Sequence, residues 1–140
     1  LATIQPEVPG LEFSGAASAA CRRRSGSMRL AGRWRIVDME LWDAEAIDLV
    51  GPGFIEFDRC RTGRFRFIAA EGLLDCREVV RDGQPGVEFT WEGSDDGDPV
   101  TGRGWAVLNS DDALDGRIFF HLGDDSGFQA TRAEPTRRAT

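Results

Sequence analysis

Short segments in which apolar and polar residues alternate dominate the chain from residue 33 onward. In residues 87–92, for example, Val87, Phe89 and Trp91 alternate with polar residues. Successive side chains of a strand point to opposite faces of a sheet, so this alternation is typical of a strand with one buried face. The pattern predicts eight strands, over residues 33–42, 54–58, 64–70, 73–80, 87–92, 103–109, 114–122 and 127–132.

Turn-forming residues separate most of these segments. Asp82-Gly83 lies between the fourth and fifth strands, and this pair tolerates the positive φ angles that a tight hairpin turn needs. Connections this short force consecutive strands to pair antiparallel. Residues 93–102 are the exception, because they are predicted to form a longer loop.

One short helix is predicted over residues 43–50. Asp43 can cap its first turn, and Gly51-Pro52 ends it. A helix of this length is unstable alone, so we expect its Ile47 and Leu49 side to dock on the sheet or at one end of a barrel.

Consecutive antiparallel strands favour closure, because an open sheet of this size would leave two exposed edges. The predicted fold is therefore mainly β: an eight-stranded antiparallel up-and-down (lipocalin-like) barrel, or a strongly curved meander, with one short helix. We assign residues 29–132 to this single domain, residues 1–28 to a disordered extension and residues 133–140 to a flexible tail.

The first residues lack the apolar pattern of the domain. They include Pro6, Pro9 and an Ala-rich run before Cys21, and Met28 stands directly before the first patterned segment. We interpret Met28 as a natural start. A signal peptide is the alternative, but no apolar stretch precedes the small residues and three arginines follow them.

Composition excludes some classes of function. The formal net charge is −7, which argues against a nucleic-acid partner. All 17 basic residues are Arg. No apolar run is long enough to cross a membrane as a helix, so no membrane partner is expected. The 3 cysteines lack the spacing of a structural zinc site, and we expect reduced thiols in a cytoplasmic protein.

Candidate catalytic and metal-binding residues are few. His121 is the single histidine of the sequence, and Asp124, Asp125 and Ser126 follow it closely. These residue types could form a catalytic triad, but no nucleophile elbow presents the serine. A strand-end histidine bound to a turn carboxylate is the favoured interpretation. The acidic residues 95–98 resemble part of a calcium loop without its distal glutamate, so a solvated loop is favoured there. We assign no catalytic residue, metal or cofactor, and an enzyme ranks third among the functions considered.

Charged residues interrupt the first apolar strand. Trp34, Ile36, Asp38, Glu40 and Trp42 share one face if no bulge intervenes. Either face of that strand then carries charge into the interior, and buried charge needs partners. The alternative is an outward ladder of salt bridges across neighbouring strands.

Two resemblances to known families concern the whole domain. Gly32-Arg33-Trp34 resembles the Gly-x-Trp signature that begins lipocalin and calycin barrels; this implies that Trp34 covers the closed end and that Arg132 or Arg117 packs against it. A longer pattern is similar to a family of small uncharacterised bacterial proteins without assigned activity, which implies no chemistry. It comprises residues 32–37, 40–43, 48–58, 91–93, 102–108 and 123–128.

Two functions remain open. The first is binding of a small apolar or cationic molecule inside the barrel, between aromatic walls and carboxylates that favour amines over fatty acids. The second is a protein-interaction or self-assembly module without a ligand pocket, for example a homodimer. The candidate ligand-binding residues are Trp34, Arg35, Glu40, Trp42, Phe67, Asp75, Trp91, Arg103, Trp105 and His121.

Overall fold

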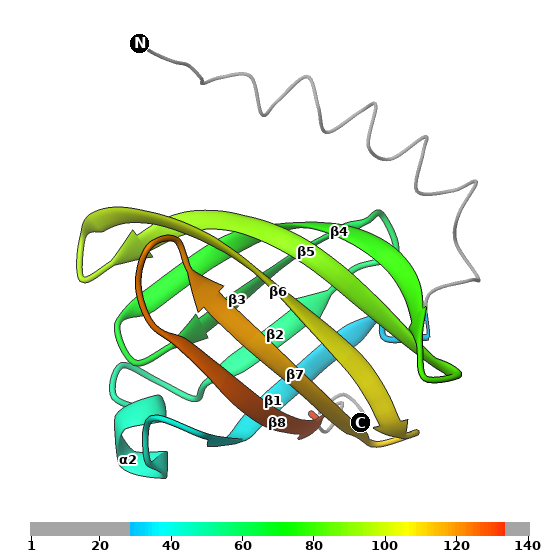
Figure 1. Cartoon of the computed structure of the whole chain (residues 1–140). Helices are drawn as coiled ribbons and strands as arrows, with labels where there is room; N and C mark the ends of the chain where they lie inside the picture. Colours follow the sequence, from blue (N-terminus) through cyan, green and yellow to red (C-terminus); the bar gives the residue numbers. More distant parts are fainter. Residues whose placement is uncertain (1–28, 134–140) are drawn as a thin grey trace, which may run out of the picture.

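The computed structural model describes residues 29–133, which form a closed barrel (Figure 1). Each strand pairs antiparallel with the next in sequence, and the last returns to the first. The fold class predicted from the sequence is confirmed. The strands are β1 (Gly32–Met39), β2 (Phe54–Phe57), β3 (Thr62–Phe67), β4 (Ala70–Arg81), β5 (Gln84–Asp95), β6 (Asp98–Ser110), β7 (Ala113–Phe120) and β8 (Asp125–Arg132), and the helix is α2 (Ala44–Ile47). The expectations for residues 1–28 and 134–140 lie outside the described residues.

The β5–β6 connection corrects one prediction. The long loop expected over residues 93–102 is instead a continuous hairpin with a two-residue turn at Asp96-Gly97, where φ is 53° and 91°. The Asp82-Gly83 turn has the same character, with φ of 50° and 81°. Asp96-Gly97 is the same type of turn-forming pair as Asp82-Gly83. The prediction was wrong because the acidic residues around Asp96-Gly97 are typical of a solvated loop and concealed this turn signal.

The helix α2 is shorter than predicted. Asp43 caps it as expected, since its Oδ1 accepts a hydrogen bond from the Ala46 amide at 2.9 Å. Ile47 is buried, whereas Leu49 lies beyond the helix and is 67% exposed. The predicted docking is thus right for Ile47 and wrong for Leu49, because the helix ends before Leu49 can turn inward.

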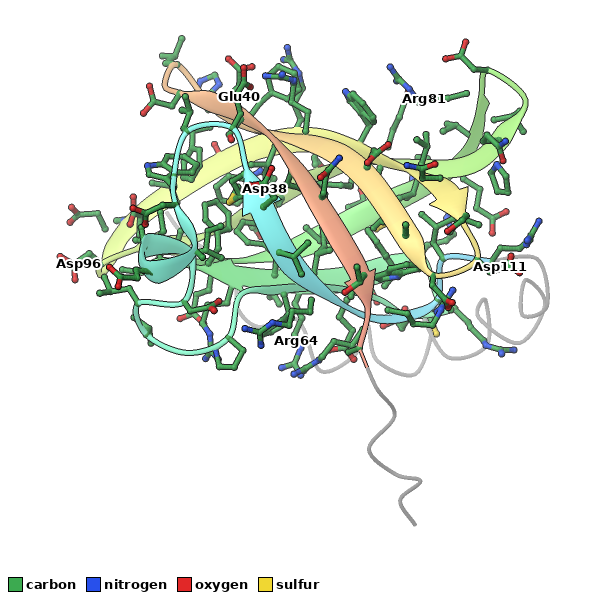
Figure 2. The ribbon with its side chains drawn as sticks, turned by 90° about the horizontal axis from the view of Figure 1, so that it is seen from below. Asp38, Glu40, Arg64, Arg81, Asp96 and Asp111 are labelled. Atoms are coloured by element: carbon green, nitrogen blue, oxygen red, sulfur yellow. The ribbon has the colours of Figure 1, made fainter. Side chains whose placement is uncertain are left out.

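A bulge in β1 decides where its charges point. The pairing of β1 with β8 shifts between Ile36 and Asp38. As a result Trp34, Ile36 and Met39 face the interior while Asp38 lies exposed. The expectation that an interior face carries charge is wrong, and Asp38 and Glu40 lie outside the barrel (Figure 2). One extra residue in the strand keeps the apolar side chains inward on both sides of the bulge.

The barrel interior is filled by aromatic rings that touch across it. Ring centroids of Phe67 and Phe120, from β3 and β7, lie 6.2 Å apart, and those of Phe57 and Phe89, from β2 and β5, lie 6.3 Å apart. Inward-facing glycines make room for these rings. A Cβ on Gly104 would lie 2.6 Å from the ring of Phe89, and one on Gly116 would lie 2.4 Å from that of Phe128.

Candidate functional site

A hollow of about 450 Å³ lies on the outer wall of the barrel. It is formed where four neighbouring strands, β4 to β7, present their outward side chains. Its lining residues are Asp75, Arg77, Glu88, Phe89, Thr90, Arg103, Gly104, Trp105 and Phe119.

Strand register brings these residues together from distant parts of the sequence. Asp75 pairs with Thr90, Thr90 with Arg103, and Arg103 with Phe119, so these side chains form one row across four strands. The next row in the same direction contains Arg77, Glu88 and Trp105. Residues two apart on a strand share a face, so both rows point outward.

Two aromatic rings in this hollow are each partnered by an arginine. The guanidinium carbon of Arg103 lies 4.9 Å from the Phe119 ring centroid, and that of Arg81 lies 4.1 Å from the Trp105 ring centroid. Guanidinium groups at this distance are attracted by the ring face and hold it in a defined orientation. The hollow therefore offers flat apolar surfaces beside positive charge.

The charges of the hollow are not all neutralised. Arg77 pairs with Asp75 at 3.3 Å, and Arg81 lies 3.9 Å from Glu88. Arg103 has no carboxylate partner among the described residues. Exposed pairs such as the first two contribute little stability, so a ligand can displace them at small cost. The unpaired charge left for a ligand is positive.

Three of the ten predicted ligand-binding residues meet in this hollow: Asp75, Arg103 and Trp105. The other seven do not join them. Trp34, Phe67 and Trp91 belong to the packed core, and Trp42 packs against that core. Arg35 pairs with Asp48, Glu40 pairs with Arg117, and His121 is exposed beside the β7–β8 turn.

The interior tryptophans have partners of their own. Trp34 Nε1 donates to the Leu30 carbonyl at 2.8 Å, and Trp91 Nε1 donates to the Phe119 carbonyl at 3.2 Å. The guanidinium carbon of Arg132 lies 4.1 Å from the Trp34 ring centroid, the arrangement that the Gly-x-Trp resemblance implies. These contacts make Trp34 and Trp91 structural parts of the barrel.

Arg117, the other arginine considered for that role, lies outside. It donates hydrogen bonds to Asp125 and to Glu40, which raise its pKa. The alternative of outward salt-bridge ladders thus describes Glu40 and also Glu56, which accepts from both Arg33 and Arg64.

The residues around His121 do not form a catalytic triad. The Ser126 hydroxyl is buried, donates to the Gly127 carbonyl and accepts from the Leu41 amide. Within residues 29–133, the His121 imidazole makes no hydrogen bond, so the expected bond to a turn carboxylate is also wrong. Asp125 is instead engaged by Arg117.

The cysteines differ from one another. Cys60 is disulfide-bonded, which corrects the expectation that all thiols are reduced, and Cys21 lies outside the described residues. Cys76 is a free thiol on β4 that faces the interior of the barrel. Burial, followed by the charges of Asp58 and Asp75, raises its pKa to about 12. Cys76 is therefore protonated and unreactive at neutral pH.

No group of three or more His, Cys, Asp or Glu side chains in the part of the chain that the structure describes is placed to hold a metal ion. No helix within residues 29–133 has the length and hydropathy needed to span a bilayer.

Sequence reasoning missed six residues of the hollow: Arg77, Glu88, Phe89, Thr90, Gly104 and Phe119. Their alternation with buried neighbours marked Glu88 and Thr90 as outward-facing, but nothing in the sequence gave the register between strands. That register places Thr90 beside Arg103 and Phe119 beside Arg103.

Comparisons with known proteins bear on the fold. No protein-family model matches the chain, and no curated protein matches it either. Among solved structures, Tp0751 (pallilysin) of Treponema pallidum is similar, with a TM-score of 0.51 and 16% sequence identity over 91% of this chain and 99% of that chain. At this identity the likeness supports the barrel fold alone.

Proposed function

We propose that this barrel is a non-catalytic binding protein that holds a small aromatic or apolar anion in the hollow between β4 and β7. The observation that carries the proposal is Arg103, which lies beside Phe119 and Trp105 without a carboxylate partner among the described residues. Ligand sites commonly combine flat apolar walls with a few polar groups that fix orientation.

The polarity of the hollow favours an anion over the cation considered from the sequence. Its carboxylates, Asp75 and Glu88, are near Arg77 and Arg81, while Arg103 remains for a ligand. A carboxylate can accept two parallel hydrogen bonds from one guanidinium group. The ring of such a ligand would lie against Trp105 or Phe119. Because this site lies on the outer wall, a ligand can bind there without any change in the packed interior of the barrel.

Three naphthalene derivatives of similar shape test the proposal: 2-naphthoate, neutral 2-naphthamide and cationic 2-naphthylmethylamine, each titrated calorimetrically into the full chain. We expect 2-naphthoate to bind most tightly. Arg103→Gln should weaken it about tenfold, the loss expected for one charge-assisted hydrogen bond at an exposed site. Arg59→Gln, which removes an exposed arginine from the β2–β3 turn, is the matched control and should change nothing.

Two results would contradict the proposal. One is equal affinity for the three probes, which would indicate adsorption without charge recognition. The other is unchanged 2-naphthoate binding in Arg103→Gln. Preference for the amine would support the cationic ligand expected from the sequence and would contradict the anion proposal.

Protein interaction or self-assembly is the second candidate, favoured by the end of the barrel that carries α2. The connections β1–β2 and β7–β8 lie at this end, and they expose Leu41, Leu49, Val50 and Leu122. Exposed aliphatic side chains gathered at one end are typical of contact surfaces. Sedimentation equilibrium over a range of concentrations tests this candidate. We expect a reversible dimer that is abolished by Leu122→Ser. A monomer at all concentrations would remove the homodimer from consideration.

A further inference from the structure

A second, smaller pocket lies on the outer wall on the other side of the barrel. It occupies about 120 Å³ between β1, β2 and β3 and the loop that precedes β2. It shares no residue with the hollow described above. Its lining residues are Arg33, Arg35, Pro52, Gly53, Phe54, Arg66 and Ala133.

Three arginines surround a buried phenylalanine here. Arg35 and Arg66 flank Phe54 in the register of the sheet, and the Arg33 guanidinium carbon lies 4.0 Å from the Phe54 ring centroid. That of Arg66 lies 5.5 Å from the same centroid. Phe54 faces outward yet is only 8% exposed. The ring thus positions guanidinium groups that would otherwise repel one another.

The pocket carries more positive than negative charge. Arg33 and its neighbour Arg64 share Glu56, and Arg35 pairs with Asp48 at 2.8 Å. Arg66 has no ion pair among the described residues, although Glu71 is its partner in the register of β4. In a chain of net charge −7, such a local excess of positive charge needs a reason. Fields of this kind concentrate small anions.

Arg66 also has an unsatisfied donor. Its Nε is buried and, within residues 29–133, makes no hydrogen bond. The side chain is confined from the other side, because a Cβ on Gly51 would lie 2.9 Å from Arg66 Nη2. A buried N–H without an acceptor is costly, and because Nε is closed off from solvent, a ligand oxygen removes this cost only if the Arg66 side chain shifts toward the pocket. Electrostatics and hydrogen bonding therefore both favour an oxyanion beside Arg66.

We propose that this pocket binds a phosphate group, free or at the end of a larger molecule. A tetrahedral dianion offers more acceptor oxygens than a carboxylate, and planar guanidinium forks can engage them in pairs. The volume of about 120 Å³ fits a single such group. This site is independent of the one in the hollow, and each can fail without the other.

Calorimetric titration of the full chain with inorganic phosphate, at low salt in a phosphate-free buffer, tests the proposal. We expect saturable binding to one site, weakened at least tenfold in Arg66→Gln and also weakened in Arg66→Lys, which keeps the charge but loses the fork. Arg59→Gln, which removes an exposed arginine from the β2–β3 turn, is the control that should bind phosphate like the unmodified chain. If Arg66→Gln fails to fold by circular dichroism, Arg35→Gln takes its place.

A second arm uses phosphatidylcholine vesicles with or without phosphatidic acid. Binding to these vesicles but not to inorganic phosphate, lost in Arg66→Gln, would assign the same phosphate chemistry to a lipid headgroup. Absence of saturable binding in both arms would overturn the proposal. So would equal losses in Arg66→Gln and Arg59→Gln, because these would reflect net charge and not a pocket.

Discussion

Individual side chains show how burial and charge shift proton affinity in this barrel. Cys76 lies on the inner face of β4. Burial, together with the charges of Asp58 and Asp75, raises its pKa to about 12. Glu56, on the outer face of β2, behaves oppositely. Partial burial alone would raise its pKa, but hydrogen bonds from Arg33 and Arg64 outweigh that effect and lower it.

The Cys76 thiol predicts a loss of stability at alkaline pH. The unfolded thiol ionises near pH 9.0 and the folded one only near pH 12, so the unfolded state releases its proton first. The free energy of unfolding should therefore fall between pH 9 and 12, by at most about 1.4 kcal/mol per pH unit. The chain contains neither Lys nor Tyr, so few other groups titrate there. Urea unfolding at several pH values measures this slope.

Cys76→Ala is the control for that measurement. It costs stability at every pH because it leaves a small cavity, but it should remove the slope above pH 9. An equally steep slope in Cys76→Ala would show that another group causes the alkaline loss.

Glu56 predicts the opposite dependence at acid pH. Because its pKa is lowered in the folded state, its contribution is present above the unfolded value of 4.5 and is lost as the pH falls through the folded value. Glu56→Gln should therefore be less stable than the unmodified chain at pH 6 and nearly equal to it at pH 2. Glu71→Gln, which removes an exposed carboxylate from β4, should show no such convergence. Chemical unfolding at the two pH values decides between them.

At the scale of strands, matched large and small residues determine how the barrel closes. Inward glycines on β6 and β7 lie against the rings of Phe89 and Phe128. Interiors of this density tolerate no added volume without strain, so the glycines are as specific as the rings they face.

Gly116→Ala should reduce the free energy of unfolding by about 2–3 kcal/mol, the upper range for overpacking a core. Its Cβ would lie 2.4 Å from Phe128 Cζ and 2.5 Å from the Trp105 carbonyl oxygen, and backbone cannot yield easily. Gly127→Ala is the matched control on β8, where the nearest atom would be 3.5 Å away. It should change stability by no more than about 0.5 kcal/mol. Similar losses in both variants would refute the packing argument.

At the scale of the whole molecule, the seam between β1 and β8 closes the sheet. Trp34 pairs with Arg132, and the Ala133 amide donates to the Arg33 carbonyl at 2.9 Å, so the two ends of the described segment are neighbours. Closure leaves no free sheet edge among the described strands. It also requires contacts between residues far apart in sequence, which form late and slowly in folding.

A circular permutant of the full chain tests this topology. Joining the two ends of the given chain and opening it at Asp82-Gly83 keeps every strand pair. It breaks only the covalent link between β4 and β5, and these two strands stay paired through their hydrogen-bonded ladder. We expect the β-rich circular dichroism and a single cooperative thermal transition to persist. Opening the chain within β5, at Phe89, should abolish both. Equal behaviour of the two permutants would contradict the barrel topology.

The sequence by itself determined the β class, the order of strands, the Asp82-Gly83 turn and the Asp43 cap. These depend on alternation and on residues adjacent in the chain. Only the tertiary structure decided the bulge near Asp38, which directs that carboxylate outward, and the register that gathers Asp75, Thr90 and Arg103. A shift of one residue in either would exchange the two faces of a strand, and local sequence carries no signal of that choice. The candidate sites therefore depend on pairings between distant segments.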